Sequence, residues 1–157
     1  MTVILVTGMS GTGKSTTLEA LALKGFHTVD TDIGDWIADL PLPGGGTEPQ
    51  WRPDRIDALI TEHERSPETL FIAGTVWNQQ DFYSRFDHIV LLSAPIDVVL
   101  ERIAARDTNP FGKAPEERER IIADTAEIEP LLRESATVEI DTRGPLADVV
   151  AQLEDLA

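Results

Sequence analysis

The sequence predicts an α/β domain in which a five-stranded parallel sheet lies between two layers of helices. Two observations lead to this three-layer α/β/α prediction. Short apolar runs alternate with helix-forming stretches along the whole chain, which is typical of a parallel sheet with helices on both faces. The first apolar run is followed by a glycine-rich loop and then by a helix-forming stretch. With its 157 residues, the chain is expected to form one domain over residues 1–157.

The first expected elements are a strand at residues 2–7, a helix at 15–24 and a second strand at 26–29. Residues 2–7 are apolar and largely β-branched, as in a buried strand. Residues 15–24 are rich in good helix formers, and Gly25 is the expected C-terminal cap of this helix. The second strand runs into an Asp-Thr-Asp sequence.

The next segment is predicted to contain a short helix at residues 33–40, a mobile loop and a longer helix at 53–65. The side chain of Thr31 or Asp32 is the expected N-cap of the short helix. Residues 41–49 contain three prolines and three glycines, a composition that predicts a loop. The longer helix begins with a proline, which the first turn tolerates. Three of its apolar residues share one face: Ile56, Leu59 and Ile60.

The second half of the chain continues the alternation of strands and helices. Apolar runs predict strands at residues 69–73, 88–92 and 137–141. Helices are expected at residues 95–106, 115–134 and 145–156, each opening with a proline. Residues 78–85 are expected to form a short helix or a loop.

The glycine-rich loop fits the phosphate-binding pattern G-x-x-x-x-G-K-[ST]. Its sequence is Gly8-Met9-Ser10-Gly11-Thr12-Gly13-Lys14-Ser15, followed by Thr16. Glycines allow backbone N–H groups to turn toward phosphate oxygens, and the next helix begins with unpaired N–H groups. Lys14 would add a cation near the β- and γ-phosphates, and the Ser15 hydroxyl would bind Mg²⁺. The alternative is a turn that binds nothing, but the strand before it and the helix after it favour a nucleotide site.

The composition excludes several classes of function. The net charge is −15, so the surface is expected to repel nucleic acid and anionic membranes. No apolar stretch approaches the ~20 residues of a membrane-spanning helix, and the chain begins with an expected strand instead of a signal peptide. Without cysteine it forms neither disulfides nor thiolate zinc sites. We therefore expect a cytoplasmic protein, and a monomer because no spare apolar helix is evident.

Two aspartates lie at the edge where ligands bind in open parallel sheets. The strand at residues 69–73 ends without the acidic residue that many P-loop proteins use near Mg²⁺, so the nearest acids are Asp30 and Asp32. We assign Asp30 as a Mg²⁺ ligand through a water molecule. Asp32 lies two residues on in an extended segment and would accept a proton from a substrate hydroxyl. The alternative is that both are turn and capping residues.

Three segments together resemble the small-molecule and nucleoside-monophosphate kinase branch of P-loop proteins, in which shikimate kinase is the most similar in layout. They are residues 8–16, residues 29–33 (Val-Asp-Thr-Asp-Ile) and residues 101–106 (Glu-Arg-Ile-Ala-Ala-Arg). The resemblance extends over nearly the whole chain. It implies the P-loop kinase fold, binding of ATP and Mg²⁺, and transfer of a phosphate to an alcohol group.

The resemblance also implies roles for individual residues. Arg102 would lie against the adenine, and Arg106, one helical turn on, would reach the transferred phosphate, unless both make only ordinary contacts along the helix. Residues 107–114 would form a short lid over ATP, with Lys113 near the phosphates. Arg143 belongs to a segment similar to the family's adenine-side loop.

The acceptor would be bound by the region at residues 33–65 and by residues near the sheet edge. The candidates are Asp32, Arg52, Gly74, Thr75, Asn78 and Arg133. Arg133 lies in a segment similar to one whose arginine meets the acceptor in the family, and Arg52 follows a tryptophan where the family has an aromatic–arginine pair. Asn78 has an equally good alternative as a helix cap.

The sequence departs from shikimate kinases on the acceptor side. It has Ala73-Gly74-Thr75 where those enzymes carry three consecutive glycines, and its short lid lacks their Arg-Pro-Leu-Leu sequence. The shikimate assignment is therefore not carried over. Three tryptophans flank this region and either line a site for a ring-bearing acceptor or belong to the core: Trp36, Trp51 and Trp77.

The sequence therefore predicts an ATP-dependent phosphotransferase that acts on a small molecule with a hydroxyl group. Lys14, Asp32 and Arg106 would carry the catalysis. The alternative from another class is a nucleotide-binding regulator or slow NTPase, which needs neither a base at Asp32 nor an acceptor pocket. A polynucleotide kinase is disfavoured by the negative net charge.

Overall fold

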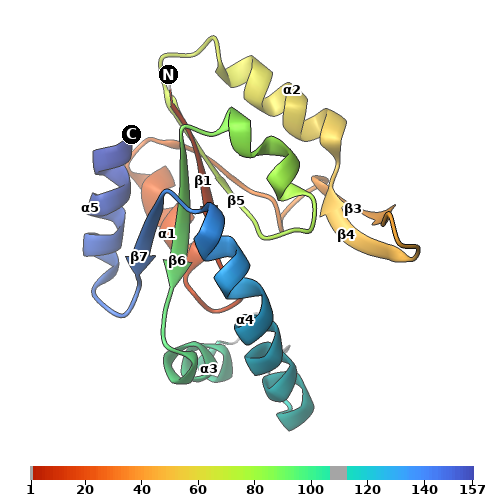
Figure 1. Cartoon of the computed structure of the whole chain (residues 1–157). Coiled ribbons are helices and arrows are strands. Elements are labelled where there is room, and N and C mark those ends of the chain that lie inside the picture. The colour runs from red at the N-terminus through yellow and green to blue at the C-terminus, as the bar shows by residue number, and fades with distance from the viewer. Residues whose placement is uncertain (1, 107–112) are drawn as a thin grey trace.

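A parallel sheet of five strands forms the centre of the molecule in a computed structural model that describes residues 2–106 and 113–157 (Figure 1). The strand order is β2-β5-β1-β6-β7. The central strand β1 (Thr2–Thr7) pairs with β5 (Thr69–Ala73) and β6 (His88–Ser93). The edge strands are β2 (His27–Asp30) and β7 (Val138–Asp141). Because all pairings are parallel, the carboxyl ends of the strands meet at one edge of the sheet, and the predicted fold class is confirmed.

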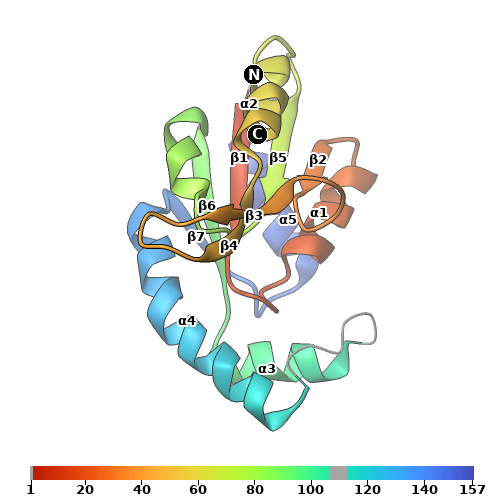
Figure 2. The ribbon, with the colours of Figure 1, turned by 90° about the vertical axis from the view of Figure 1, so that its right-hand side faces the viewer.

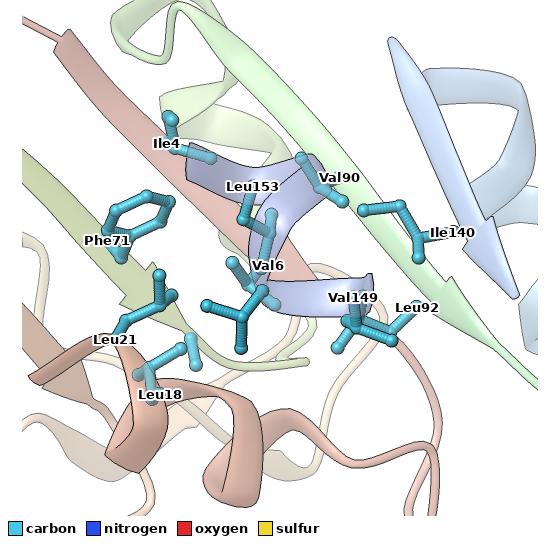
Figure 3. Packing of buried hydrophobic residues seen from close by; sticks show 12 residues of the cluster. Ile4, Val6, Leu18, Leu21, Phe71, Val90, Leu92, Ile140, Val149 and Leu153 are labelled. Atoms are coloured by element: carbon cyan, nitrogen blue, oxygen red, sulfur yellow. The ribbon is translucent and has the colours of Figure 1, made fainter. Parts of the chain in front are cut away.

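Helices cover both faces of this sheet, and the alternation of side chains along β1 explains how. Ile4 and Val6 are buried with residues of α1 (Lys14–Leu23) and α5 (Leu146–Leu156) (Figure 3). Val3 and Leu5 are buried with residues of α2 (Pro53–His63) and of the 3₁₀ helix η1 (Gln79–Arg85). A strand with two buried faces reads as a continuous apolar run, which is how this strand was recognised in the sequence.

Two further helices follow β6: the first lies beyond its carboxyl end, and the second runs back from there alongside the sheet toward the start of β7 (Figure 1). They are α3 (Ile96–Ala105) and α4 (Pro115–Ser135), and they share a small apolar cluster formed by Val99, Ile103 and Ile121. This cluster fixes α3 close to the loop between β1 and α1, since a side chain on Gly11 would meet Val99 at 2.9 Å.

The prediction for residues 33–49 is wrong. Instead of a helix and a mobile loop, the structure has a hairpin of β3 (Ile37–Pro41) and β4 (Thr47–Trp51), which pair antiparallel with Ile37 opposite Trp51. Gly45 and Gly46 adopt positive φ angles of 96° and 76°, which lets the chain reverse between the strands. Its prolines are tolerated because a two-stranded ribbon has free edges. Figure 2 shows the hairpin on the side of the sheet that α2 covers.

The other predicted elements are present, and their ends differ from the predicted ends by at most two residues. The segment at residues 78–85 is the 3₁₀ helix η1. Among the residues that the structure describes, none of the helices combines the length and the apolar character that crossing a bilayer would demand.

Candidate functional site

The loop between β1 and α1 has the backbone of a phosphate cradle. Gly8 and Gly11 adopt positive φ angles of 152° and 83°. A side chain on Gly8 would meet the backbone oxygen of Leu92 at 2.4 Å, so the close approach of this loop to β6 requires glycine. All residues from Gly8 to Thr16 line one cleft except Thr12, which is buried and donates a hydrogen bond to the Met9 carbonyl at 2.7 Å.

Lys14 closes this loop on itself. Its Nζ donates to the carbonyl oxygens of Gly8 and Met9, at 2.5 Å and 3.2 Å. Burial lowers the pKa of Lys14 from its usual 10.5 to about 8, although the nearby Asp32 and Asp30 carboxylates oppose the shift. The ammonium group is thus held by carbonyl oxygens inside the loop, and phosphate oxygens would replace them as its partners.

Ser15 and Asp30, the two residues assigned to Mg²⁺ from the sequence, meet at the start of α1. The Ser15 hydroxyl donates to Asp30 Oδ2 at 2.6 Å, and the Asp32 backbone N–H donates to Asp30 Oδ1 at 3.1 Å. A hydroxyl and a carboxylate are oxygen ligands that suit Mg²⁺, which usually keeps several waters. The described residues contain no cluster of three or more metal-binding side chains, so phosphate oxygens and waters would complete the coordination.

Asp32 lines the same cleft as Lys14 and is reached from solvent. The surrounding walls desolvate its carboxylate, which raises its pKa; Lys14 opposes this shift, and Asp30 adds to it. A carboxylate with a raised pKa is a better proton acceptor than an ordinary aspartate, so its electrostatic setting suits a general base.

The cleft itself has a volume of about 730 Å³ and is bounded by the phosphate loop, Asp32, Thr75, Arg102, Arg106 and Ile128. It contains the three residues to which the sequence analysis assigned catalysis: Lys14, Asp32 and Arg106. A second hollow of about 580 Å³ lies beside Thr2 at the other end of the sheet and contains none of the predicted site residues.

Arg102 links three segments on one side of the cleft. Its Nη1 donates to Thr142 Oγ1 at 2.9 Å and to the Gly11 carbonyl at 3.4 Å, and its Nη2 donates to the Thr142 carbonyl at 2.5 Å. The guanidinium therefore joins α3 to the phosphate loop and to the loop after β7. Arg143, in that last loop, is exposed and paired with Asp141 at 2.8 Å, and it is not among the residues that line the cleft.

Arg133 is not brought to the cleft. Its Nε pairs with Glu139 on β7 at 2.8 Å, its Nη2 pairs with Glu129 at 3.2 Å, and the hydrogen bond from Arg133 lowers the pKa of Glu139. The residue of α4 that lines the cleft is Ile128. The sequence predicted this helix but not its rotation about its axis, because the apolar residues of α4 do not form one strong stripe.

Three other acceptor candidates lie outside the cleft and support the fold around it. Asn78 is buried, and its amide accepts from the Trp51 N–H at 2.9 Å and donates to the Trp51 carbonyl at 3.0 Å. A side chain on Gly74 would meet Thr31 Oγ1 at 2.3 Å. Arg52 pairs with Asp35 at 3.1 Å.

The tryptophans separate into different environments. Trp51 is fully buried and belongs to the core, where its indole N–H donates to Thr31 Oγ1 at 3.0 Å. Trp36 is partly buried against the same cluster, and Trp77 is about half exposed (49%). The interpretation of these residues as core is therefore correct for Trp51.

The sequence analysis missed a chain of hydrogen bonds that supports the phosphate loop and begins at the buried residues Gln79 and Thr7. Gln79 Nε2 donates to Thr7 Oγ1 at 3.1 Å, and Thr7 Oγ1 lies 3.0 Å from Thr75 Oγ1. Thr75 Oγ1 in turn donates to the Gly8 carbonyl at 2.6 Å and accepts from the Gly8 N–H at 3.2 Å. The signal available in the sequence was a threonine closing an apolar strand. Thr75, which the sequence analysis assigned to the acceptor, lines the cleft, but its hydroxyl is engaged by the loop.

The predicted lid at residues 107–114 lies largely outside the described residues, which resume at Lys113. Lys113 is exposed and does not line the cleft as described.

The chain matches a known protein family over most of its length. Residues 4–123 match a family described as an AAA domain, and this span includes the phosphate loop, both aspartates, Arg102 and Arg106. The chain belongs to the AAA domain family. No curated protein sequence matches this AAA domain at a significant level.

Solved structures similar to this AAA domain include kinases. A shikimate kinase from Acinetobacter baumannii, in complex with shikimate, is 20% identical with a TM-score of 0.62, over 99% of this chain and 92% of that chain. A shikimate kinase from Bacteroides thetaiotaomicron is 18% identical with a TM-score of 0.63, over 99% and 97%. A sugar kinase from Janibacter is 16% identical with a TM-score of 0.58, over 99% and 93%. The expected P-loop kinase fold is thus confirmed.

Proposed function

We propose that this protein transfers the γ-phosphate of Mg-ATP to a hydroxyl group of a small molecule. The observation that carries the proposal is that Asp32 and Lys14 line the same cleft. One supplies a cation within a loop shaped for phosphates, and the other supplies a carboxylate with a raised pKa. Phosphoryl transfer depends mainly on positioning and electrostatics. Lys14 would stabilise the phosphate that is transferred, and Asp32 would bind the hydroxyl that receives it.

The nucleotide would be bound mainly by the loop from Gly8 to Ser15. Its backbone N–H groups and the start of α1 would surround the β- and γ-phosphates, with Lys14 as the cation. Ser15 and Asp30 would hold Mg²⁺, which neutralises charge on the phosphates when bound. Arg102, fixed between Gly11 and Thr142, supports an adenine position on that side of the cleft.

The transfer would begin with the acceptor hydroxyl hydrogen-bonded to Asp32. As the hydroxyl oxygen attacks the γ-phosphorus, its proton moves to the Asp32 carboxylate, and the bond from the γ-phosphorus to the bridging oxygen of ADP breaks. Lys14 and Arg106 would stabilise the negative charge on the phosphate oxygens in flight. Asp30 keeps the Asp32 backbone in place through the hydrogen bond from its N–H.

A slow NTPase or nucleotide-binding regulator is the second candidate. One observation favours it: four of the predicted acceptor residues lie outside the cleft, namely Arg52, Gly74, Asn78 and Arg133. Such a protein would use the phosphate loop without an acceptor.

The two functions differ in whether ADP release depends on an acceptor. We would incubate the protein with Mg-ATP and a panel of hydroxyl-bearing metabolites, and measure ADP release and the mass of the products. The kinase proposal requires that one class of acceptor raises ADP release and is phosphorylated in equal amount. ADP release that is the same with and without every acceptor would instead support the NTPase.

A further inference from the structure

We infer that the acceptor is an uncharged hydroxyl compound with an apolar face, and not a carboxylate. This inference rests on the proposed phosphotransfer at Asp32. It follows from where the cations of the described residues lie and from which side chain α4 presents to the cleft.

The arginines on the acceptor side are paired with carboxylates of the chain itself. Arg52 Nη2 and Arg55 Nη2 each lie 3.1 Å from one oxygen of Asp35, so both oxygens of that carboxylate are used. Arg133 is paired with Glu139 at 2.8 Å and with Glu129 at 3.2 Å. A carboxylate ligand is best bound by an arginine that offers two parallel N–H donors, and these arginines are both engaged and outside the cleft.

The cations that line the cleft lie on its nucleotide side. They are Lys14 in the phosphate loop, Arg102 in α3 and Arg106 directly after α3. The phosphates of a bound nucleotide, together with Asp30 and Asp32, already offset their positive charge. Residues 107–112, outside the described part, contain neither lysine nor arginine in the sequence. Among the described residues that line the cleft, a further negative charge on the acceptor would therefore meet no cation besides these three, and Asp32 would repel it.

Two isoleucines, Ile103 of α3 and Ile128 of α4, give the cleft apolar lining. Ile128 is the only residue of α4 that lines the cleft within the described chain, and it is partly buried there. The Thr75 hydroxyl already accepts and donates hydrogen bonds with Gly8. An acceptor would thus place one hydroxyl on Asp32 and pack a hydrocarbon face against Ile128, as is usual when few polar groups orient a ligand in an apolar pocket.

Matched pairs of acceptors test this inference. Each pair has a neutral compound and its carboxylate counterpart: glycerol and glycerate, glucose and gluconate, and pantothenol and pantothenate. ADP release from Mg-ATP would give kcat/KM for each. Calorimetry would give the affinity for the protein with Mg²⁺ and a nonhydrolysable ATP analogue. We expect the neutral member of the preferred pair to be favoured by at least about tenfold, or ~1.4 kcal/mol.

Two variants at the same position sharpen the test. Ile128→Lys places a cation on the acceptor wall, and we expect it to shift the preference toward the carboxylate member by about tenfold or more. Ile128→Met keeps the wall apolar and should leave the preference unchanged. A lysine variant that fails to fold leaves the wild-type preference as the deciding measurement.

The outcomes separate the inference from the proposed function. A wild-type preference for carboxylates, or equal use of both classes, overturns the inference but leaves phosphotransfer intact. The same holds if a folded Ile128→Lys variant keeps the wild-type preference. If neither class raises ADP release, the proposed function fails and the inference fails with it.

Discussion

Lys14 connects the geometry of the phosphate loop to nucleotide binding. Its ammonium donates to two loop carbonyls, and burial lowers its pKa to about 8. A bound phosphate would stabilise the protonated form and raise this pKa again. Proton uptake by Lys14 is therefore coupled to nucleotide binding in the range above neutral pH.

We expect the affinity for an Mg²⁺-bound ATP analogue to fall as the pH rises above about 8. Below that pH, Lys14 is already protonated before the nucleotide binds, so binding needs no free energy to protonate it. Above it, the neutral amine must first take up a proton, so Kd should rise toward tenfold per pH unit. Calorimetry between about pH 6.5 and about pH 9.5 measures this dependence. Lys14→Arg, which stays charged, is the control and should remove the change near pH 8; a flat wild-type profile would contradict the prediction.

Replacing Asp32 by Asn should separate phosphotransfer from nucleotide binding. The amide has the same size but cannot accept the hydroxyl proton, so acceptor-dependent turnover should fall by at least ~100-fold. The Kd of the nucleotide should stay within about threefold, because Asp32 is not assigned to the phosphates. Steady-state kinetics and calorimetry give the two numbers. Asp39→Asn is the matched control, an exposed acid of β3 outside the cleft that should leave both near the wild-type values. Lost nucleotide binding in Asp32→Asn would indicate a metal-binding or folding role.

At the scale of secondary-structure elements, η1, the end of β1 and the loop after β5 support the phosphate loop through side chains. The Val76 N–H donates to Gln79 Oε1 at 2.9 Å, which orients the amide so that its Nε2 donates to Thr7. The Thr75 hydroxyl continues this chain of hydrogen bonds: it donates to the Gly8 carbonyl and accepts from the Gly8 N–H. Because Gln79 and Thr7 are buried, water does not compete for the hydrogen bond between them, and the donor and acceptor of that bond are fixed.

Thr75→Val should weaken both the fold and the nucleotide site, whereas Thr75→Ser should not. Valine has nearly the same shape but leaves the Gly8 N–H without its partner and Thr7 without its neighbour, which is expected to cost about 1–3 kcal/mol. Urea unfolding measures this loss, and calorimetry should show a higher Kd for the Mg²⁺-bound ATP analogue. Serine keeps the hydroxyl and serves as the control. If valine and serine behave alike, the hydroxyl does not position the loop.

The β3–β4 hairpin shows why one element could not be predicted locally. Residues 33–40 contain helix formers, and the glycines that follow suggest a loop. The pairing of Ile37 with Trp51 and the two hydrogen bonds between the Asn78 amide and the Trp51 backbone decide the structure instead. Those contacts join segments that are distant in sequence, and tertiary contacts of this kind override local propensity.

At the scale of the whole molecule, nucleotide binding should stabilise the fold. The phosphate loop contacts β6 and α3, and Arg102 ties α3 to the loop after β7, so the cleft depends on the folded chain. A ligand that binds only the folded protein at about 100 times its Kd adds ~2.7 kcal/mol. For a domain of this size the midpoint of thermal unfolding should rise by roughly 5–10 °C.

Differential scanning fluorimetry with Mg-ATP analogue measures that rise. Chelating Mg²⁺ should reduce the rise in the unfolding midpoint, because the ion would no longer link Ser15 and Asp30 to the phosphates. Lys14→Ala should lose most of it and is the matched control for the loop. An unchanged midpoint at saturating nucleotide, or the same rise in Lys14→Ala, would contradict the assignment of the loop.

The amino-acid sequence by itself determined the features that depend on neighbouring residues. Three features follow from local patterns: the phosphate loop, the strands buried on two faces and the aspartates at the end of β2. The patterns are glycine spacing, apolar runs and the order of strands along one edge. The tertiary structure alone decided which distant side chains share the cleft. It placed Ile128 there and left Arg133 and Asn78 outside, because helix rotation and hairpin pairing depend on packing between segments that are far apart in the chain.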